Sequence, residues 1–399
     1  MSGELISKAP KLQAPLIPLI GQNSLLCLRG ERHRRERKLL MPPFHGERMH
    51  AYGEIICDIT QQVLSQFTPG ANLSARSVTQ NITLEVMLKV VFGIHEEGCF
   101  HNLKKRITSL LDFFQSPLTS SLLYLPLLRR DLGSWSPWGH FNSLLKQVDQ
   151  LIYAEIENRR TQYDHSRTDI LTLLMSACDE NGQEMSDIEL RDELFTLLFA
   201  GHETTATSLS WALYWVHKQP EILKKLLSEL DSLSENPEPM SIVKQPYLTA
   251  VCNETLRISP TVLLTMPRDV TEPMELTGYQ LEPGTQVSGC IYLTHHREDL
   301  YPQPKEFKPE RFLQRQYTAY EFLPFGGGAR RCLGEALAMF EMKLVLATIL
   351  SNYQLKLADN KPVKPEIRSV TIAPKGGVKM VLKGKRQHQR LSEASYSLI

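Results

Sequence analysis

Several features that would point to other kinds of protein are missing from this chain of 399 residues. No run of about 18 continuous apolar residues occurs, so no transmembrane helix is indicated. The first 22 residues contain three prolines and no uninterrupted apolar stretch, and they do not resemble a signal peptide. The formal net charge is only +1, which argues against a protein that binds nucleic acid through its overall charge. These absences favour a cytoplasmic protein.

The seven cysteines contain no CxxC pair, and their odd number does not suggest a disulfide framework. We expect reduced thiols, most of them in small, buried hydrophobic positions. The chain also lacks internal repeats, low-complexity tracts and a linker that would divide it. We therefore expect one monomeric domain over residues 1–399, with a disordered polar tail at residues 385–399.

The spacing of the apolar residues is mainly helical. With 42% hydrophobic residues, a chain of this length can form a core large enough to enclose a cofactor. The longest helix is expected over residues 190–216, because Ser186 and Glu189 form a capping box ahead of it and Pro220 ends it. Its middle is apolar around most of its circumference, so it should cross the interior. Further helices are expected at residues 46–67, 147–162, 221–230 and 246–258, and one more begins near residue 333.

Short segments with β-branched residues follow in the last third of the chain, separated by Gly or Pro turns. The expected strands lie within residues 261–266, 274–281, 285–293 and 353–382. The fold class predicted from these patterns is mainly α with a minor β portion.

The most informative segment is FGGGARRCLGE, residues 325–335. Its glycines permit an open backbone that approaches a flat ligand closely. Cys332 is expected at the start of the helix that follows, where the helix N-terminus and the neighbouring arginines favour the thiolate. A thiolate surrounded by backbone N–H donors is suited to be the axial ligand of haem iron.

Three other interpretations of this segment compete with the haem ligand. A phosphate-binding loop is disfavoured because Arg331 occupies the third glycine position of the dinucleotide fingerprint. A nucleophilic cysteine would need a histidine partner, which one sequence does not place in space. A structural glycine loop with a buried cysteine is the third.

The segment resembles the haem-binding signature of the cytochrome P450 family. The fixed positions of that signature are filled by Phe325, Gly326, Gly328, Arg330, Cys332 and Gly334. The resemblance implies that Cys332 is the proximal iron ligand and that Arg330 pairs with a haem propionate. It also implies the family fold, with haem between the long central helix and the cysteine loop.

Residues 200–205, AGHETT, resemble the oxygen-binding motif of the same family. The resemblance implies that Ala200 and Gly201 leave room beside the haem face and that Glu203 and Thr204 relay protons. Taken alone, the motif is also compatible with a polar break in a buried helix. A zinc-binding HExxH motif is excluded because residue 206 is alanine.

Two more groups of residues match the family in the same order along the chain. Glu254 and Arg257 resemble the ExxR motif, and with Arg311 of the segment PERF they are implied to form a buried triad. Arg268 resembles the arginine at a strand end that contacts a propionate. His33 and Arg37, four positions apart on one helix face, are implied to contact the propionates too.

The sequence departs from the family near its N-terminus. Family members usually have several dozen more residues before the helix that bears His33, so we expect the N-terminal strands and early helices to be missing here. A truncated chain, a misassigned start or a shortened variant would explain this. A sheet edge would then lack a partner.

The resemblance implies an enzyme that uses haem b and O2 to insert one oxygen atom into a C–H bond of a lipophilic molecule. A fatty acid or alkane is the first expectation and a terpenoid the second, with pocket walls at residues 198–201, 261–264 and 371–373. A ferredoxin with its reductase, or a flavodoxin, would supply electrons, and the basic residues Arg34, Arg35 and Lys38 are candidates for docking it. A haem-thiolate isomerase or peroxygenase, an inactive haem-binding protein and a nucleotide-binding protein are the alternatives.

Overall fold

The computed structural model describes residues 6–8, 15–44, 46, 48–94, 96–113, 119, 121–122, 125, 128–133, 135–162, 164, 166–368 and 370–386. The disordered tail is predicted at residues 385–399, and its residues after 386 lie outside the described residues. The first residue of the predicted tail, Lys385, is the last residue of strand β10 (Lys379–Lys385).

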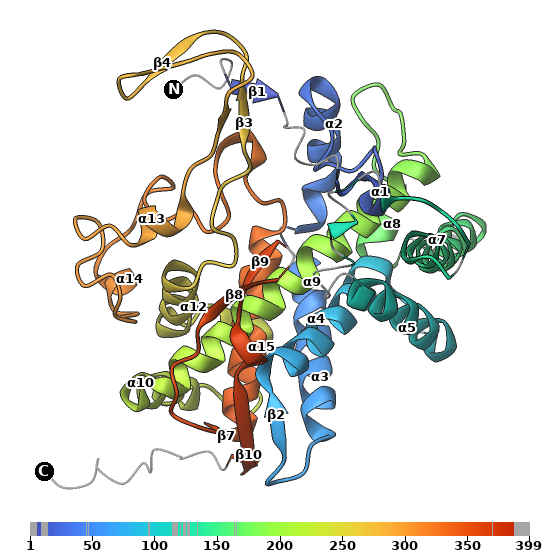
Figure 1. Ribbon diagram of the computed structural model, residues 1–399. Helices are drawn as coiled ribbons and strands as arrows, with labels where there is room; N and C mark the ends of the chain where they lie inside the picture. The colour runs from blue at the N-terminus through green and yellow to red at the C-terminus, as the bar shows by residue number, and fades with distance from the viewer. Residues whose placement is uncertain are drawn as a thin grey trace, which may run out of the picture.

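Helices make up most of the described chain, as the sequence predicts (Figure 1). They are α1 (Ile17–Ile20), α2 (Gly30–Leu40), α3 (Arg48–Ser65), α4 (Ala75–Phe92), α5 (Glu97–Phe113), α7 (Pro137–Thr161), α8 (Ile170–Met175), α9 (Asp187–Lys218), α10 (Pro220–Asp231), α11 (Pro239–Val243), α12 (Pro246–Ile258), α13 (Ile291–His295), α14 (Arg311–Gln314) and α15 (Glu335–Asn352).

Helix α9 is the central element of the fold, and its predicted course through the interior is confirmed. The capping box is present: the Glu189 amide donates to Ser186 Oγ at 3.3 Å, and the Ser186 amide donates to Glu189 Oε2 at 2.9 Å. The helix packs against α4, α12, α15 and strand β9 (Thr371–Pro374). Because Leu194 and Leu209 are completely buried in this packing, α9 is held on several sides by apolar contacts.

The strands form small antiparallel sheets that lie mostly in the C-terminal third of the chain. They are β1 (Ile6–Lys8), β2 (Asn72–Ser74), β3 (Arg268–Val270), β4 (Met274–Leu276), β5 (Tyr279–Leu281), β6 (Gln286–Val287), β7 (Tyr353–Leu357), β8 (Pro365–Arg368), β9 and β10. The sheets have the orders β1-β3-β6 and β2-β10-β7, and β4–β5 and β8–β9 form two-stranded sheets. The predicted fold class, mainly α with a minor β portion, is confirmed.

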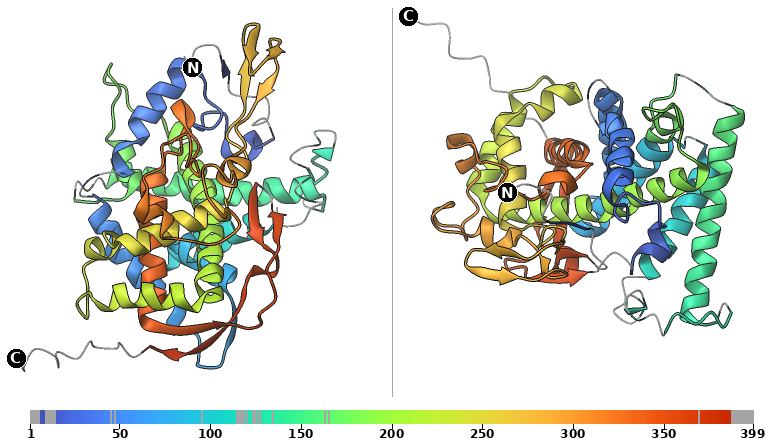
Figure 2. Two further views of the ribbon diagram at one scale, coloured as in Figure 1. Left: turned by 90° about the vertical axis from the view of Figure 1, so that its left-hand side faces the viewer. Right: turned by 90° about the horizontal axis from the view of Figure 1, so that it is seen from above.

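The long helix separates two regions of the molecule. In both Figure 1 and the view from above in Figure 2, α5 and α7 lie on one side, and β4, α13 and α14 lie on the other. Upstream of α2, strand β1 pairs with β3, with Ile6 opposite Val270. One edge of β3 therefore has a partner from the N-terminal segment.

Of two predicted strands, the one within residues 285–293 is right only in part and the one within residues 261–266 is wrong. Of residues 285–293 only β6 is extended, and α13 begins within the segment. Residues 261–266 contribute only an isolated bridge, between Leu264 and Cys290. Tertiary hydrogen bonds override the β propensity here, because the Ile291 amide donates to the Leu263 carbonyl at 2.8 Å and the Gly289 amide donates to Thr265 Oγ1 at 2.9 Å.

Candidate active site

A cavity of about 1080 Å³ lies between α9 and the cysteine loop, residues 325–334. This volume is at the upper end of the range of small-molecule sites, which is roughly 300–1000 Å³. Every residue that the sequence analysis assigns to the cofactor lines it: His33, Arg37, Ala200, Gly201, Arg268, Phe325, Gly326, Arg330, Cys332 and Gly334. The cavity therefore collects residues from four separate parts of the chain.

The predicted pocket walls are correct only in part. Thr261, Val262 and Thr371 line the cavity. Leu198 does not, because its side chain is completely buried in the core on another face of α9. Gly201 also faces α4. A Cβ at this position would lie only 2.8 Å from Cε of Met87. Gly201 thus also permits close packing of α4 against α9.

The backbone of the cysteine loop depends on two glycines. Gly326 and Gly328 have φ angles of 69° and 65°, in the left-handed region that other residues seldom adopt. The Cys332 amide donates to the Phe325 carbonyl at 2.9 Å, which closes the loop. This conformation turns the Cys332 side chain toward the cavity, to which it is exposed.

The expected position of Cys332 at a helix start is wrong by three residues, because α15 begins at Glu335. The expected lowering of its pKa is also wrong for the protein by itself. Burial raises the pKa of the Cys332 thiol, and the Gly334 amide, Arg37 and Arg331 only partly oppose this effect. A metal cation bound to the sulfur would favour the thiolate and oppose this effect.

Cations surround one end of the cavity without acidic partners. Arg37, Arg268 and Arg330 form no ion pair among the residues that the structure describes. Two N–H groups of Arg330 donate instead to the carbonyls of Leu25, at 2.9 Å, and Leu28, at 2.5 Å. Burial and the repulsion of Arg268, Arg29 and Arg37 lower the pKa of Arg330 to about 10.

His33 lies beside these arginines, and their charge affects its protonation. Burial, followed by repulsion from Arg330, Arg37 and Arg268, lowers the pKa of His33 to about 4. Such an arrangement is unfavourable unless an anion binds there. The two propionates of haem are anions of the right kind, so the residues present fit this group.

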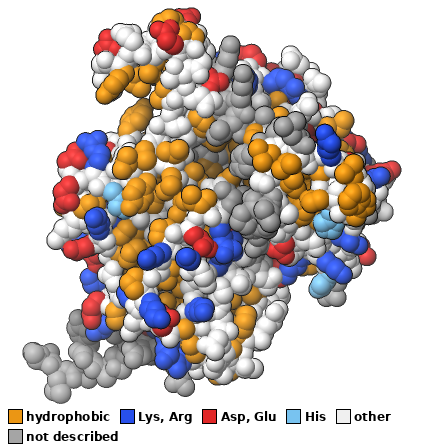
Figure 3. All heavy atoms as spheres, in the orientation of Figure 1, with side chains coloured by type: hydrophobic (Ala, Val, Ile, Leu, Met, Phe, Trp, Pro, Cys, Tyr) orange, Lys and Arg blue, Asp and Glu red, His pale blue; other side chains and the backbone are white. Residues whose placement is uncertain are grey.

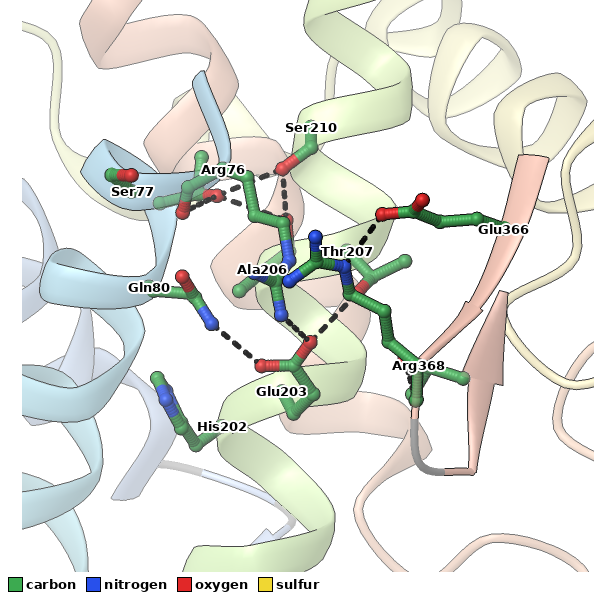
Figure 4. Close-up of polar contacts among 12 residues, drawn as sticks. Arg76, Ser77, Gln80, His202, Glu203, Ala206, Thr207, Ser210, Glu366 and Arg368 are labelled. Atoms are coloured by element: carbon green, nitrogen blue, oxygen red, sulfur yellow. Dashed lines mark hydrogen bonds and ion pairs between the residues drawn. The ribbon is translucent and has the colours of Figure 1, made fainter. Parts of the chain in front are cut away.

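Glu203 does not point to Thr204 but to helix α4 (Figure 4). Arg76 Nη2 lies 2.5 Å from Glu203 Oε1, and Gln80 Nε2 donates to Glu203 Oε2 at 2.8 Å. The hydroxyl of Thr204 donates to the Ala200 carbonyl at 2.6 Å, within its own helix. Both expected relay residues line the cavity, and both are engaged in local hydrogen bonds.

Sequence reasoning missed Arg76 and Gln80. They lie 127 and 123 residues from Glu203, and nothing in the local pattern of α4 sets them apart from other polar residues of a helix. Their role is visible only when α4 and α9 are packed together.

The three residues predicted as a triad are in contact and buried. Arg257 Nε lies 2.7 Å from Glu254 Oε2 and Arg257 Nη2 lies 2.8 Å from Glu254 Oε1. Arg311 Nε lies 3.2 Å from Glu254 Oε1. The two partners of the shorter pair are completely buried, and Arg311 is 8% exposed. Backbone carbonyls accept further N–H groups of both arginines.

The basic residues proposed for docking a partner all have acidic neighbours within the chain. Arg34 pairs with Glu31. Arg35 Nε lies 2.6 Å from Asp179 Oδ2, and Lys38 Nζ lies 2.5 Å from Glu180 Oε1. Their positive charge is therefore partly compensated locally.

Comparison with known proteins agrees with this site. The family model for cytochrome P450 matches residues 16–380, which include the cysteine loop, the α9 motif and the triad. The chain belongs to the cytochrome P450 family. Its members are monooxygenases that bind haem b through a cysteine thiolate and use O2 with electrons from a redox partner. This cytochrome P450 is thus a haem-dependent monooxygenase.

The relatives cover nearly all of this cytochrome P450. Putative cytochrome P450 135B1 of Mycobacterium tuberculosis is 36% identical over 389 residues, which is 97% of this chain and 80% of the relative. Putative cytochrome P450 137 of the same organism is 33% identical over 367 residues, 92% and 74% of the two chains.

A solved structure has the same fold. The retinoic acid bound cyanobacterial CYP120A1 superposes with a TM-score of 0.85 at 26% identity, over 97% of this chain and 86% of that one. No helix among the described residues is long and apolar enough to cross a membrane.

Proposed function

We propose that Cys332 is the cysteine that binds the haem iron in this monooxygenase and that the surrounding cavity holds haem and substrate together. The observation that carries this proposal is the meeting of Cys332, the uncompensated cations and the α9 motif on the walls of one cavity. Bound haem supplies the activation of O2.

The cations and the loop hold the cofactor in this proposal. Arg37, Arg268 and Arg330 bind the propionates as charged donors, and His33 binds them as a neutral donor. Phe325, Gly326 and Gly334 would shape the part of the loop that holds the cofactor. Ala200 and Gly201, on α9, would leave space in the cavity for O2 and substrate. The triad of Glu254, Arg257 and Arg311 supports the segment below the loop.

Glu203 and Thr204 deliver protons to the reacting oxygen in this proposal. Thr204 does so when its hydroxyl turns from the Ala200 carbonyl toward the cavity, a rotation about one side-chain bond. Glu203 has to leave Arg76 and Gln80 first. Proton delivery is therefore linked to a change in the contacts between α4 and α9.

The substrate we propose is a lipophilic small molecule, a fatty acid or alkane first and a terpenoid second. Apolar residues make up much of the cavity wall, and Val262, Leu264 and Val370 are also exposed at its rim. Hydrophobic side chains gather on the face shown in Figure 3. An exposed apolar rim is favourable for the entry of such molecules. The relative with bound retinoic acid is consistent with this class.

The remaining assignments are proposals as well. We infer that the electrons come from a ferredoxin with its reductase or from a flavodoxin, and that residues 1–399 act as one monomeric domain. A cytoplasmic location stays a prediction from the sequence.

The absorption spectrum of the reduced, CO-bound protein tests the assignment of Cys332. We expect the thiolate-type Soret band in the wild type and its loss in Cys332→Ala, because no other described side chain of the loop offers a thiolate. The matched control is Cys178→Ala, since Cys178 is exposed and lies outside the cavity lining. A thiolate-type band that persists in Cys332→Ala contradicts the proposal.

A further inference from the structure

His295 is a completely buried histidine that connects two parts of the fold. It is the last residue of α13, between the triad and the cysteine loop. Its backbone carbonyl accepts Arg257 Nη1 at 2.8 Å. Its ring nitrogen Nε2 accepts the Leu323 amide at 3.0 Å. His295 therefore contacts the buried ion pair through its main chain and the segment at Leu323 through its side chain.

The segment that His295 holds leads directly into the cysteine loop. Leu323 lies two residues before Phe325, and the Gly326 amide donates to the Leu323 carbonyl at 3.0 Å. The Phe325 carbonyl in turn accepts the Cys332 amide at 2.9 Å. Hydrogen bonds of ordinary length, joined by His295 and by the main chain of residues 323–326, thus link Arg257 to the backbone of Cys332.

The chemistry of the ring shows that Nε2 is the group that matters. An acceptor nitrogen carries no proton, so the single proton of the neutral ring is on Nδ1. Nδ1 is buried and makes no hydrogen bond of good geometry among the described residues, although the backbone of Arg257 and of Leu256 lies close enough to the ring to favour its protonated form. Burial and the nearby Arg257 lower the pKa of His295 to about 3, so the ring stays neutral near neutral pH. The ring also stacks on Phe322, with centroids 5.4 Å apart.

A buried histidine with one unsatisfied nitrogen is unfavourable for stability alone. An apolar residue of similar size would pack at the same place and would remove the poorly paired Nδ1. The acceptor at Nε2 is what an apolar residue does not provide. The Leu323 amide would otherwise lose its partner at the edge of the cavity that Leu323 lines.

We propose that His295 is a positioning residue for the iron ligand, which fixes the backbone before Phe325 through its Nε2 acceptor and so holds Cys332 in place. The inference rests on the proposed role of Cys332. His295 touches neither the cavity nor the sulfur, so it acts through the loop. Loss of the acceptor is expected to loosen the loop and to favour protonation and displacement of the ligand sulfur.

The test compares two substitutions that keep different halves of the histidine. His295→Phe keeps a ring that stacks on Phe322 and removes the acceptor. His295→Gln removes the ring and keeps an acceptor at nearly the position of Nε2. Neither substitution removes the backbone contact with Arg257. The control is His296→Phe, because the His296 side chain, at the C-terminal end of α13, contacts Tyr292, whose carbonyl lies 2.8 Å from Nδ1 and whose ring it stacks on.

The readout is the ratio of the thiolate-type to the thiol-type Soret band of the reduced, CO-bound protein. The loss of one buried acceptor should change this ratio by roughly tenfold toward the thiol type in His295→Phe. His295→Gln should stay within about threefold of the wild type. His296→Phe should leave the ratio unchanged. The reduction potential of the iron should shift with the ratio, because it depends on the ligand sulfur.

Three results would overturn the inference. An unchanged ratio in His295→Phe means that the acceptor does not position the loop. Equal loss in His295→Gln and His295→Phe means that ring packing, not the acceptor, is responsible. Equal loss in His296→Phe means that any change at the end of α13 suffices. If His295→Phe does not fold, His295→Asn replaces it, because its shorter amide does not reach Leu323 and the same loss is expected.

Failure of the proposed function is distinguishable from failure of this inference. If Cys332→Ala keeps the thiolate-type band, the assignment of the ligand is wrong whatever the His295 variants show. If Cys332→Ala loses the band and His295→Phe keeps the wild-type ratio, only the inference about His295 is wrong.

Discussion

Removal of Arg257 should cost more stability than removal of any other member of the triad. In Arg257→Met, Glu254 loses its two contacts with Arg257, at 2.7 and 2.8 Å, in a completely buried site. The carbonyls of His295 and Pro304 also lose the donors that lie 2.8 and 2.9 Å away. The variant therefore leaves one buried charge half paired and two buried carbonyls unpaired.

The magnitude follows from these losses. Breaking a buried ion pair costs about 3–5 kcal/mol, and each unsatisfied buried acceptor costs about 1–3 kcal/mol. The sum is about 5–11 kcal/mol, which is comparable with the whole stability of a typical domain, about 5–15 kcal/mol. In Arg311→Met, Glu254 loses one contact of 3.2 Å, and the Pro302 carbonyl loses a donor at 3.0 Å, at a residue that is 8% exposed. We expect a cost near 3 kcal/mol there.

Urea denaturation, followed by tryptophan fluorescence, measures these costs. Arg257→Met should be unfolded or nearly so without denaturant, and Arg311→Met should be folded with a lower midpoint. The control is Arg297→Met, which removes an ion pair with Asp299 whose two side chains are 57% and 61% exposed. It should change the unfolding free energy by less than about 1 kcal/mol. A wild-type midpoint in Arg257→Met, or a larger loss in Arg311→Met, would refute the reasoning.

Two further predictions concern groups at the cavity wall. Arg76→Met should release Glu203 from α4 and raise the fraction of reducing equivalents lost as peroxide several-fold. Gln80→Leu removes only a neutral contact and should raise this fraction less. Equal peroxide yields in wild type and Arg76→Met would contradict the role of this ion pair. Burial raises the pKa of Glu341 from 4.5 to about 8, so the folded state binds its proton more tightly than the unfolded state. The stability of the wild type should therefore fall relative to that of Glu341→Gln as the pH rises from 4.5 to 8. A difference in unfolding midpoint that does not change with pH would contradict this prediction.

The sequence predicted well those features that depend on neighbouring residues. The capping box of Ser186 and Glu189 and the limits of α12 follow from local spacing, and both are confirmed. The contact of Glu254 with Arg257 follows from their spacing of three on a helix. Alternation and helical periodicity carry this information directly, so the fold class could be predicted without coordinates.

Features that depend on packing between distant segments were not predictable. The ion pair of Arg76 with Glu203 joins two helices, and the hydrogen bond from Leu323 to His295 joins two irregular segments. The raised pKa of Cys332 depends on how much protein surrounds it, which local charges did not indicate. The α13 helix forms because backbone groups of residues 263 and 265 bind its start, a contact that propensity does not describe.

The unpaired arginines at the cavity link the lifetime of this protein in the cell to the supply of its cofactor. Without an anion between them, Arg37, Arg268 and Arg330 repel one another inside the folded chain. A ligand that binds only the folded state stabilises it by mass action, and here that ligand also removes the repulsion. In cells that make the polypeptide faster than haem, the haem-free protein should therefore be less stable and be degraded by proteases. The amount of intact protein should then follow the rate of haem synthesis more closely than the level of its messenger RNA.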